Sequence, residues 1–228
     1  MKKFELTSET KINIFGKKLF RIKALISFAD VEAGETGGWV EKEGNVNQSG
    51  NAWVYGNAMV YGDAMVSGNA KVYGDAMVSG DAKVSGDAEV SGNAKVSGDA
   101  MVSGNAWVYG NAMVSGDAMV SGNAKVYGDA MVSGDAKVSG DAEVSGNAKV
   151  YGDAMVSGDA DYTTIHGFGT QFRTTTFFRC KDKKVRVACG CFFGTIPEFR
   201  EQVKNTRKGK IAEEYLMIAD LMENHFEK

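Results

Sequence analysis

Aromatic and charged side chains recur in this sequence at every eighteenth position, on both sides of regularly spaced valines. Aromatic rings beside charged groups suit flat ligands such as sugars or bases, which stack on the rings and hydrogen-bond to the polar groups. The plainer alternative is a surface ladder of Trp–Lys, Lys–Glu and Tyr–Tyr contacts that stabilises only the protein. The candidate ligand-binding residues are Trp53, Tyr55, Lys71, Tyr73, Glu89, Trp107, Tyr109, Lys125, Tyr127 and Glu143.

Aspartates also recur with this period and without interruption, as Asp63, Asp81, Asp99, Asp117, Asp135 and Asp153. If these aspartates stack at the spacing of neighbouring strands, about 4.8 Å, each pair of carboxylates repels by about 0.9 kcal/mol even in water. Hydrogen bonds to turn amides, raised carboxyl pKa values or bound cations such as Ca²⁺ would relieve this repulsion. The aspartates are therefore candidate metal ligands, and the alternative is that Asp is simply a good turn residue.

A third candidate site is a set of basic residues near the C-terminal end, interleaved with Phe172, Phe177 and Phe178. Basic groups beside aromatic rings could bind a phosphate-bearing ligand. The alternative is a solvated hairpin face that complements an acidic neighbour, because residues 50–160 carry a net charge of −7 and residues 161–228 one of +3. The basic residues are Arg173, Arg179, Lys181, Lys183, Lys184 and Arg186.

Catalytic chemistry has little support. The two histidines, His166 and His225, lie outside the repeats and show no nucleophile or base beside them. Cys189 and Cys191 with Cys180 do not have the CxxC spacing of a zinc site or an obvious fourth ligand, so buried thiols are the better interpretation. We expect no catalytic residue, no enzymatic activity and no cofactor.

The middle of the chain is built from a six-residue unit, V-[S/Y]-G-[D/N]-A-x, with Val at every sixth position from Val54 to Val156. A step of six keeps Val on one face of an extended chain but scatters it around a helix. Gly followed by Asp or Asn favours a sharp turn after each short strand. A single unit cannot bury its Val, so the units must coil and stack with hydrogen bonds between successive coils.

A duplication sets the number of sides of the coil. Residues 49–104 and 103–158 are identical except at Tyr61/Ser115 and Ser97/Tyr151, so the two copies are offset by nine six-residue units. Nine units divide by three but not by two or four. A duplicated block that keeps its faces in register therefore predicts an all-β solenoid, a three-sided parallel β-helix with 18-residue coils.

The unit V-S-G-D-A-K resembles the hexapeptide repeat of the left-handed parallel β-helix family, in which an aliphatic residue fills the core and a small residue packs at the corner. The resemblance implies a left hand and, by analogy, a trimer. Acyltransferases of that family use a histidine near a loop that interrupts the coils, whereas residues 52–160 contain neither histidine nor interruption. The flanks resemble uncharacterised hexapeptide-repeat proteins of tailed phages and Firmicutes, which implies a phage or prophage setting.

Both ends of a solenoid expose unpaired strand edges and need caps. The pattern predicts an N-terminal β cap over residues 1–37 with a hairpin turning near Gly16, a β-helix over 38–168, and a C-terminal cap of one hairpin and two helices over 169–228. Glycines 38, 44 and 50 lie at the glycine positions of the six-residue period, which predicts an imperfect first coil before the regular ones. Tyr162 and Phe168 lie at the valine positions of the same period, which predicts that their larger side chains close the last coil. Thr195 and Glu198 form a capping box, and an apolar stripe predicts the final helix.

The other two outward surfaces carry methionine, lysine and serine. The residues before Val are Met59, Met77, Lys95, Met113, Met131 and Lys149 on one surface, and Met65, Lys83, Met101, Met119, Lys137 and Met155 on the other. Exposed methionine columns favour lateral self-association, whereas the lysines keep the surfaces solvated.

We expect a cytoplasmic, non-enzymatic scaffold or binding module, with a small-molecule or protein ligand and neither membrane nor nucleic-acid partners. The alternatives are a ligand-sequestering oligomer, which would bind a small molecule or nucleotide, and a degenerate acyltransferase.

Overall fold

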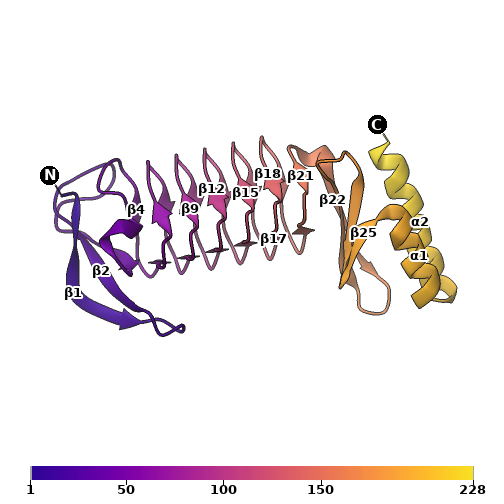
Figure 1. The fold of residues 1–228 in the computed structure, drawn as a ribbon, viewed down its shortest axis with the longest axis horizontal. Helices are drawn as coiled ribbons and strands as arrows, with labels where there is room; N and C mark the ends of the chain where they lie inside the picture. Colours follow the sequence, from indigo (N-terminus) through magenta and orange to yellow (C-terminus); the bar gives the residue numbers. More distant parts are fainter. Residues whose placement is uncertain (1, 228) are drawn as a thin grey trace.

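The computed structural model describes residues 2–227, except for the side chain at position 159. It is a straight parallel β-solenoid with a β-hairpin cap at its N-terminal end and a sheet with two helices at its C-terminal end (Figure 1). No helix among the described residues is long and apolar enough to span a membrane.

Three sheets run along the solenoid, one on each side, and each is built from two-residue strands. The first, which we call face one, contains β4 (Trp53–Val54), β7 (Lys71–Val72), β10 (Glu89–Val90), β13 (Trp107–Val108), β16 (Lys125–Val126) and β19 (Glu143–Val144). Face two contains β5 (Met59–Val60), β8 (Met77–Val78), β11 (Lys95–Val96), β14 (Met113–Val114), β17 (Met131–Val132) and β20 (Lys149–Val150). Face three contains β6 (Met65–Val66), β9 (Lys83–Val84), β12 (Met101–Val102), β15 (Met119–Val120), β18 (Lys137–Val138) and β21 (Met155–Val156).

The predicted three-sided coil is confirmed, with the repeat length that the duplication indicated. Val90 pairs in parallel with Val108, one coil on, and every repeat Val from Val54 to Val156 and every repeat Ala from Ala52 to Ala154 lies in the core with 0–1% of its surface exposed. Gly98 shows why the unit requires glycine: its φ is +70°, and a Cβ there would lie 3.0 Å from the backbone nitrogen of Gly116. The handedness of the solenoid stays a prediction.

The N-terminal cap continues the sheet of face two. Strands β1 (Phe4–Ile12) and β2 (Lys18–Ala24) form the predicted hairpin around Gly16, and β3 (Thr36–Val40) joins β2 to β5. The expectation that glycines 38 and 44 continue the regular spacing of the turns is wrong. Val40 pairs with Val60 and Val46 with Val66, because the bend between Val46 and β4 makes this coil two positions longer than the regular ones; η1 (Glu43–Asn45) lies between Val40 and Val46, which keep the regular spacing.

The hydrogen bonds between coils all run in one direction, so one cap must supply hydrogen-bond donors and the other must supply acceptors. Each coil donates its N–H groups to carbonyls of the next coil, as Met101 does to Ala118 over 2.9 Å. The first coil therefore presents unpaired carbonyls, which would be costly to leave buried without donors. Each corner of that coil receives a side-chain donor: Lys3 Nζ reaches the Ala52 carbonyl at 2.8 Å, Arg21 Nη1 reaches Gly56 at 3.0 Å, and Asn45 Nδ2 reaches Ala64 at 2.8 Å.

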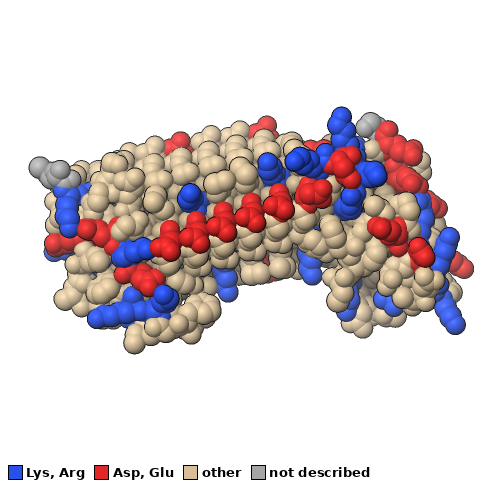
Figure 2. Space-filling model, in the orientation of Figure 1, with Lys and Arg blue, Asp and Glu red and all other residues tan. Residues whose placement is uncertain are grey.

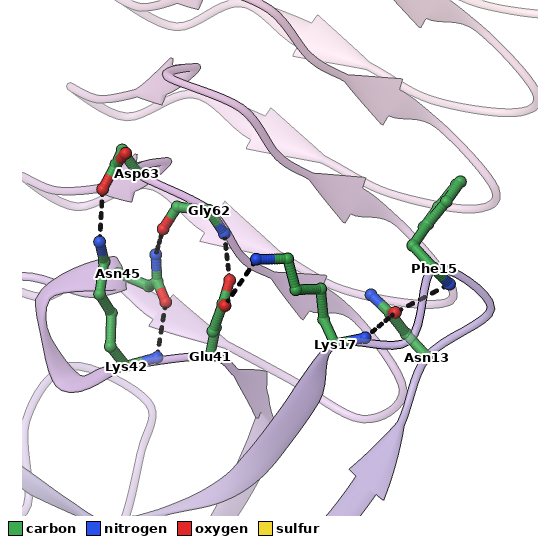
Figure 3. A network of polar contacts seen from close by, with 8 residues as sticks. All are labelled: Asn13, Phe15, Lys17, Glu41, Lys42, Asn45, Gly62 and Asp63. Atoms are coloured by element: carbon green, nitrogen blue, oxygen red, sulfur yellow. Dashed lines mark hydrogen bonds and ion pairs between the residues drawn. The ribbon is translucent and has the colours of Figure 1, made fainter.

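The buried Asn45 illustrates this arrangement in detail. Its Nδ2 donates to the carbonyls of both Gly62 and Ala64, and its Oδ1 accepts a hydrogen bond from the backbone N–H of Lys42 (Figure 3). Beside it, Lys42 Nζ forms an ion pair with Asp63. The N-terminal cap thus satisfies the coil edge with side chains where the backbone of β3 does not reach.

The C-terminal cap is a four-stranded antiparallel sheet followed by two helices. It contains η2 (Asp159–Asp161), β22 (Tyr162–Phe168), β23 (Arg173–Arg179), β24 (Val185–Cys189), β25 (Phe192–Thr195), α1 (Ile196–Thr206) and α2 (Gly209–Phe226). The predicted capping box is confirmed, with Thr195 N–H bound to Glu198 Oε2 at 2.7 Å. The helices pack on the outer side of the sheet, and the apolar stripe of α2 joins a second core with Phe177 and Phe199.

The last coil is closed differently from our expectation. Tyr162 and Phe168 do not continue the Val phase, because β22 pairs antiparallel with β23. Phe178 and Cys180 of the cap instead pack against the solenoid core. The cap also supplies an acceptor, since the N–H of Lys149 donates to Thr176 Oγ1 at 3.0 Å.

Candidate functional site

The cap covers the first strand of face one. Trp53 was expected to be exposed, but none of its surface reaches solvent. The rings of Phe4 and Phe28 lie edge-on to the indole at centroid distances of 5.8 and 5.5 Å. Trp53 is therefore a packing residue of the cap and offers no stacking surface to a ligand, so its expected place in a ligand-binding surface is wrong.

Asp30 of the N-terminal cap contacts two more candidate residues, Tyr55 and Lys71. The Tyr55 hydroxyl donates to Asp30 Oδ1 at 3.1 Å, and Lys71 Nζ lies 3.0 Å from Asp30 Oδ2. The hydrogen bond from Lys71 lowers the pKa of Asp30, and burial, helped by the hydrogen bond to Asp30, raises the pKa of Tyr55. Beyond them, the Tyr73 hydroxyl donates to Glu89 at 2.7 Å beside an open hollow of about 350 Å³.

The C-terminal half of face one has the same residue types at the equivalent positions, but the N-terminal cap does not cover it. Trp107 is 46% exposed, and its ring meets Tyr109 edge-on at 6.5 Å. Tyr109 stacks on Tyr127 with ring centroids 4.9 Å apart and planes 4° apart, which confirms the expected tyrosine pair. Lys125 forms the expected ion pair with Glu143 at 2.7 Å.

This exposed group continues toward the C-terminal cap. The Tyr127 hydroxyl donates to Glu143 Oε2 at 3.3 Å. A hollow of about 310 Å³ follows, lined by Tyr127, Glu143 and Ser145 from the coils and by Tyr162, Thr163 and Thr164 from β22. We call the surface formed by Trp107, Tyr109, Lys125, Tyr127 and Glu143 the aromatic platform. It offers an indole face, phenol rings, a balanced ion pair and hydroxyl groups within one strip.

The aspartate corner forms a continuous acidic row along the coils (Figure 2). The other two corners contain asparagines, which make side-chain ladders: Asn105 donates to Asn123 at 3.0 Å and Asn123 to Asp141 at 2.9 Å. The all-Asp corner has no such donors. Lys42 lowers the pKa of Asp63 at one end of the row through its hydrogen bond and charge. Among the described residues, no group of three or more acidic, histidine or cysteine side chains is arranged to hold a metal ion.

The basic set does not form one patch with its phenylalanines. Phe177 and Phe178 are fully buried, so they offer no stacking surface. At one end of β23, Arg179 pairs with Asp161 at 3.5 Å and donates to the Phe226 carbonyl at 2.8 Å.

The remaining basic residues divide into two places. Arg186 pairs with Asp182 at 2.8 Å, in the hairpin turn where Lys181, Lys183 and Lys184 are exposed. Arg173 begins β23, six residues before Arg179 and therefore roughly 20 Å away along an extended strand.

The cysteines and histidines form no catalytic constellation in the described chain. Cys180 is buried, and burial raises its thiol pKa to about 12, which suppresses the reactive thiolate. Cys189 accepts a hydrogen bond from Thr175 Oγ1 at 3.1 Å, whereas Cys191 is exposed. His166 and His225 are both exposed.

Sequence reasoning missed residues that lie outside the repeats. Asp30 organises the N-terminal half of face one, and Thr163 and Thr164 line the hollow beside the aromatic platform. These residues have no periodic partner, so no pattern connects them to face one. Thr163 and Thr164 follow the last repeat closely, but this does not specify the face, and Asp30 lies well before the first repeat.

Comparison with known proteins agrees with the coil geometry. Five segments match the family model described as the YdcK beta solenoid repeat: residues 52–68, 70–86, 94–110, 106–122 and 124–140. All five lie within the regular coils and none reaches a cap. No curated protein matched the chain.

Proposed function

Because this chain is a hexapeptide-repeat-like β-helix protein with two dissimilar caps, we propose that it is a non-enzymatic binding module built on a rigid scaffold. Its aromatic platform binds a neutral, hydroxyl-rich ligand of the carbohydrate class. The observation that carries this proposal is the unequal use of two copies of one sequence. The copy at Trp53 is built into the cap, whereas the copy at Trp107 is exposed.

The chemistry of the platform favours a sugar over an ion. An exposed indole face supports stacking of the apolar face of a pyranose ring, as aromatic rings do at polar binding sites. Lys125 and Glu143 neutralise each other at 2.7 Å, so the strip has no excess charge to select an anion or a cation. Ser145 and Thr163 add hydroxyl groups at the end of the strip, where a second sugar unit would lie.

The solenoid supplies rigidity and distance. Six regular coils at a strand spacing of about 4.8 Å separate the caps by roughly 29 Å. Every coil is hydrogen-bonded to its neighbours, so the platform is held at a constant position between the caps. A phage or prophage setting is part of this proposal and rests on the resemblance of the flanks.

A second candidate, a self-associated form that sequesters a ligand, is favoured by face three. Met65, Met101 and Met155 are 42%, 37% and 39% exposed there. Three such faces brought together would bury methionine columns, which suits a trimer. Analytical ultracentrifugation at micromolar concentration tests this association, and loss of the oligomer in Met101→Lys is the expected result. A monomer at all concentrations contradicts it.

The main proposal is tested with a glycan array followed by fluorescence titration of the oligosaccharides that bind. Trp107 is the tryptophan that reports binding, because Trp39 and Trp53 are 8% and 0% exposed. We expect a ligand-dependent change in the emission of Trp107 in the wild type. Isothermal titration calorimetry, which does not need this reporter, should show at least a tenfold loss of affinity in Trp107→Ala. Met101→Ala, which truncates an exposed residue of the preceding strand on another face, should bind normally. Equal binding by both variants, or no bound glycan, would refute the platform.

A further inference from the structure

Two adjoining cavities lie where the last coil meets the C-terminal cap, away from the aromatic platform. The outer cavity has a volume of about 510 Å³ and opens between the end of face two and the loop before β23. The inner cavity has a volume of about 160 Å³ and lies between β24, β25 and the two helices. Arg173 and Cys191 line both, so the two cavities meet at these residues.

The electrostatic character of this pair of cavities is one-sided. Lys149 and Arg173 line the outer cavity, Arg173 and Arg207 the inner one, and no carboxylate lines either. Within residues 2–227, none of these three cations takes part in an ion pair. Other arginines of the same cap are paired, as Arg200 is with Asp220 at 2.7 Å. Unpaired cations that converge on a concave surface are an anion-binding arrangement.

The backbone holds Arg173 in place between the cavities. Gly190 has a φ of +60°, and a Cβ at that position would lie 2.5 Å from Arg173 Nη1. The guanidinium group of Arg173 therefore lies against the backbone of Gly190, in space that the side chain of any other residue would occupy. Arg173 and Arg207 line the inner cavity together with Tyr215, and their charges oppose the rise that burial causes in the pKa of this tyrosine.

The outer cavity adds a surface for a ring. Phe172 is 73% exposed and has a φ of +47°, a conformation that non-glycine residues rarely adopt and that turns the chain just before Arg173. Asn147 and Thr174 provide polar groups on the same cavity. An exposed phenyl ring beside cations is the combination on which a nucleobase stacks.

We infer that these cavities bind a phosphate-bearing small molecule with a flat ring, with its phosphate between Arg173 and Arg207 and its ring against Phe172. The inner cavity equals the liquid volume of about five water molecules, at about 30 Å³ each, which is enough for a phosphoryl group. The outer cavity has the size of a site for a ligand as large as a nucleoside. Arginine forks match phosphate oxygens and Lys149 adds a further positive charge at the entrance.

Isothermal titration calorimetry of the full chain tests this inference with three probes: adenosine monophosphate, inorganic phosphate and adenosine. We expect the monophosphate to bind more tightly than phosphate and adenosine to bind least. Arg173→Gln and Arg207→Gln should each weaken monophosphate binding at least tenfold. Lys181→Gln is the matched control, because Lys181 is an exposed cation of the same cap that lines neither cavity.

Phe172→Ala separates the two parts of the site. It should reduce binding of the monophosphate to the level of inorganic phosphate and leave phosphate binding unchanged. Circular dichroism of each variant controls for folding. The inference is overturned if neither phosphate nor the monophosphate binds at millimolar concentration, or if Lys181→Gln weakens binding as much as the two arginine variants.

Discussion

Trp53 and Trp107 stand at the same position of two copies of one repeat block, yet Trp53 is fully buried and Trp107 is 46% exposed. The strands that carry them are equivalent, and each pairs with the strand one coil further on. The difference comes from Phe4 and Phe28, which reach Trp53 from the N-terminal cap. One copy of the duplicated tryptophan thus packs under the cap, and the other is exposed on the surface.

The two tryptophans should differ sharply in their contribution to stability. Trp53→Ala leaves a cavity under two aromatic rings and should lower the free energy of unfolding by about 3–5 kcal/mol. Trp107→Ala removes a half-exposed ring from the surface and should cost less than about 1 kcal/mol. Urea denaturation followed by circular dichroism measures both. Equal losses would mean that the cap does not cover Trp53 in solution.

Asn45 should be the most sensitive asparagine of those described. Asn45→Ala leaves the buried carbonyls of Gly62 and Ala64 without their donor and should cost about 2–3 kcal/mol. Asn93, which donates only to exposed Asn111 at 3.1 Å, is the control. Asn93→Ala should change stability by less than about 0.5 kcal/mol. If the two variants unfold at the same urea concentration, the coil edge does not depend on this side chain.

Lys3 should make stability depend on pH. Burial lowers its pKa from 10.5 to about 8, so between pH 8 and pH 10 the unfolded chain keeps a proton that the folded chain has lost. The free energy of unfolding of the wild type, relative to Lys3→Met, should therefore rise across this window, by at most about 3 kcal/mol. Below pH 8 the cost of burying the charge is fully present.

The measurement is a urea titration of both proteins at pH 7, 8, 9 and 10. It stops at pH 10 because the folded pKa of Tyr55 is raised, so ionisation of this tyrosine in the unfolded chain favours unfolding at higher pH. A difference that stays constant from pH 7 to pH 10 would show that the carbonyls of Gly50 and Ala52 keep Lys3 protonated.

Removal of residues 71–124 should leave a folded, shorter protein. The deletion takes out nine six-residue units, or three coils, and places Lys125 opposite Asp30 in the position of Lys71. Small-angle scattering should show a particle shorter by about 14 Å with its β-sheet content kept. It should also lose binding at the aromatic platform, because Trp107 and Tyr109 are removed.

A deletion one residue shorter is the control. Removing residues 72–124 shifts the six-residue period by one and turns the following valines toward solvent. This variant should aggregate or unfold. If it behaves like the three-coil deletion, the periodic pattern does not set the register of the coils.

The regular part of the fold could be predicted because its information is local. Val at every sixth position, the glycine at each turn and the nine-unit offset of the duplication specify strand length, inward face and number of sides, and each coil contacts only its neighbours. The hairpin around Gly16 and the capping box at Thr195 were predictable for the same reason. Residues a few positions apart carry each of these signals.

The sequence by itself therefore determined a three-sided solenoid of stacked Val–Ala coils and the presence of a cap at each end. Only the tertiary structure decided which copy of the aromatic strip is exposed, that β22 closes the chain in an antiparallel sheet, and that Lys149, Arg173 and Arg207 line adjoining cavities. Several of these features join segments that are far apart along the chain, such as Phe28 with Trp53, and Arg173 with Arg207 around the inner cavity. Nothing periodic links such segments, because their contacts depend on how the caps fold over the ends of the solenoid.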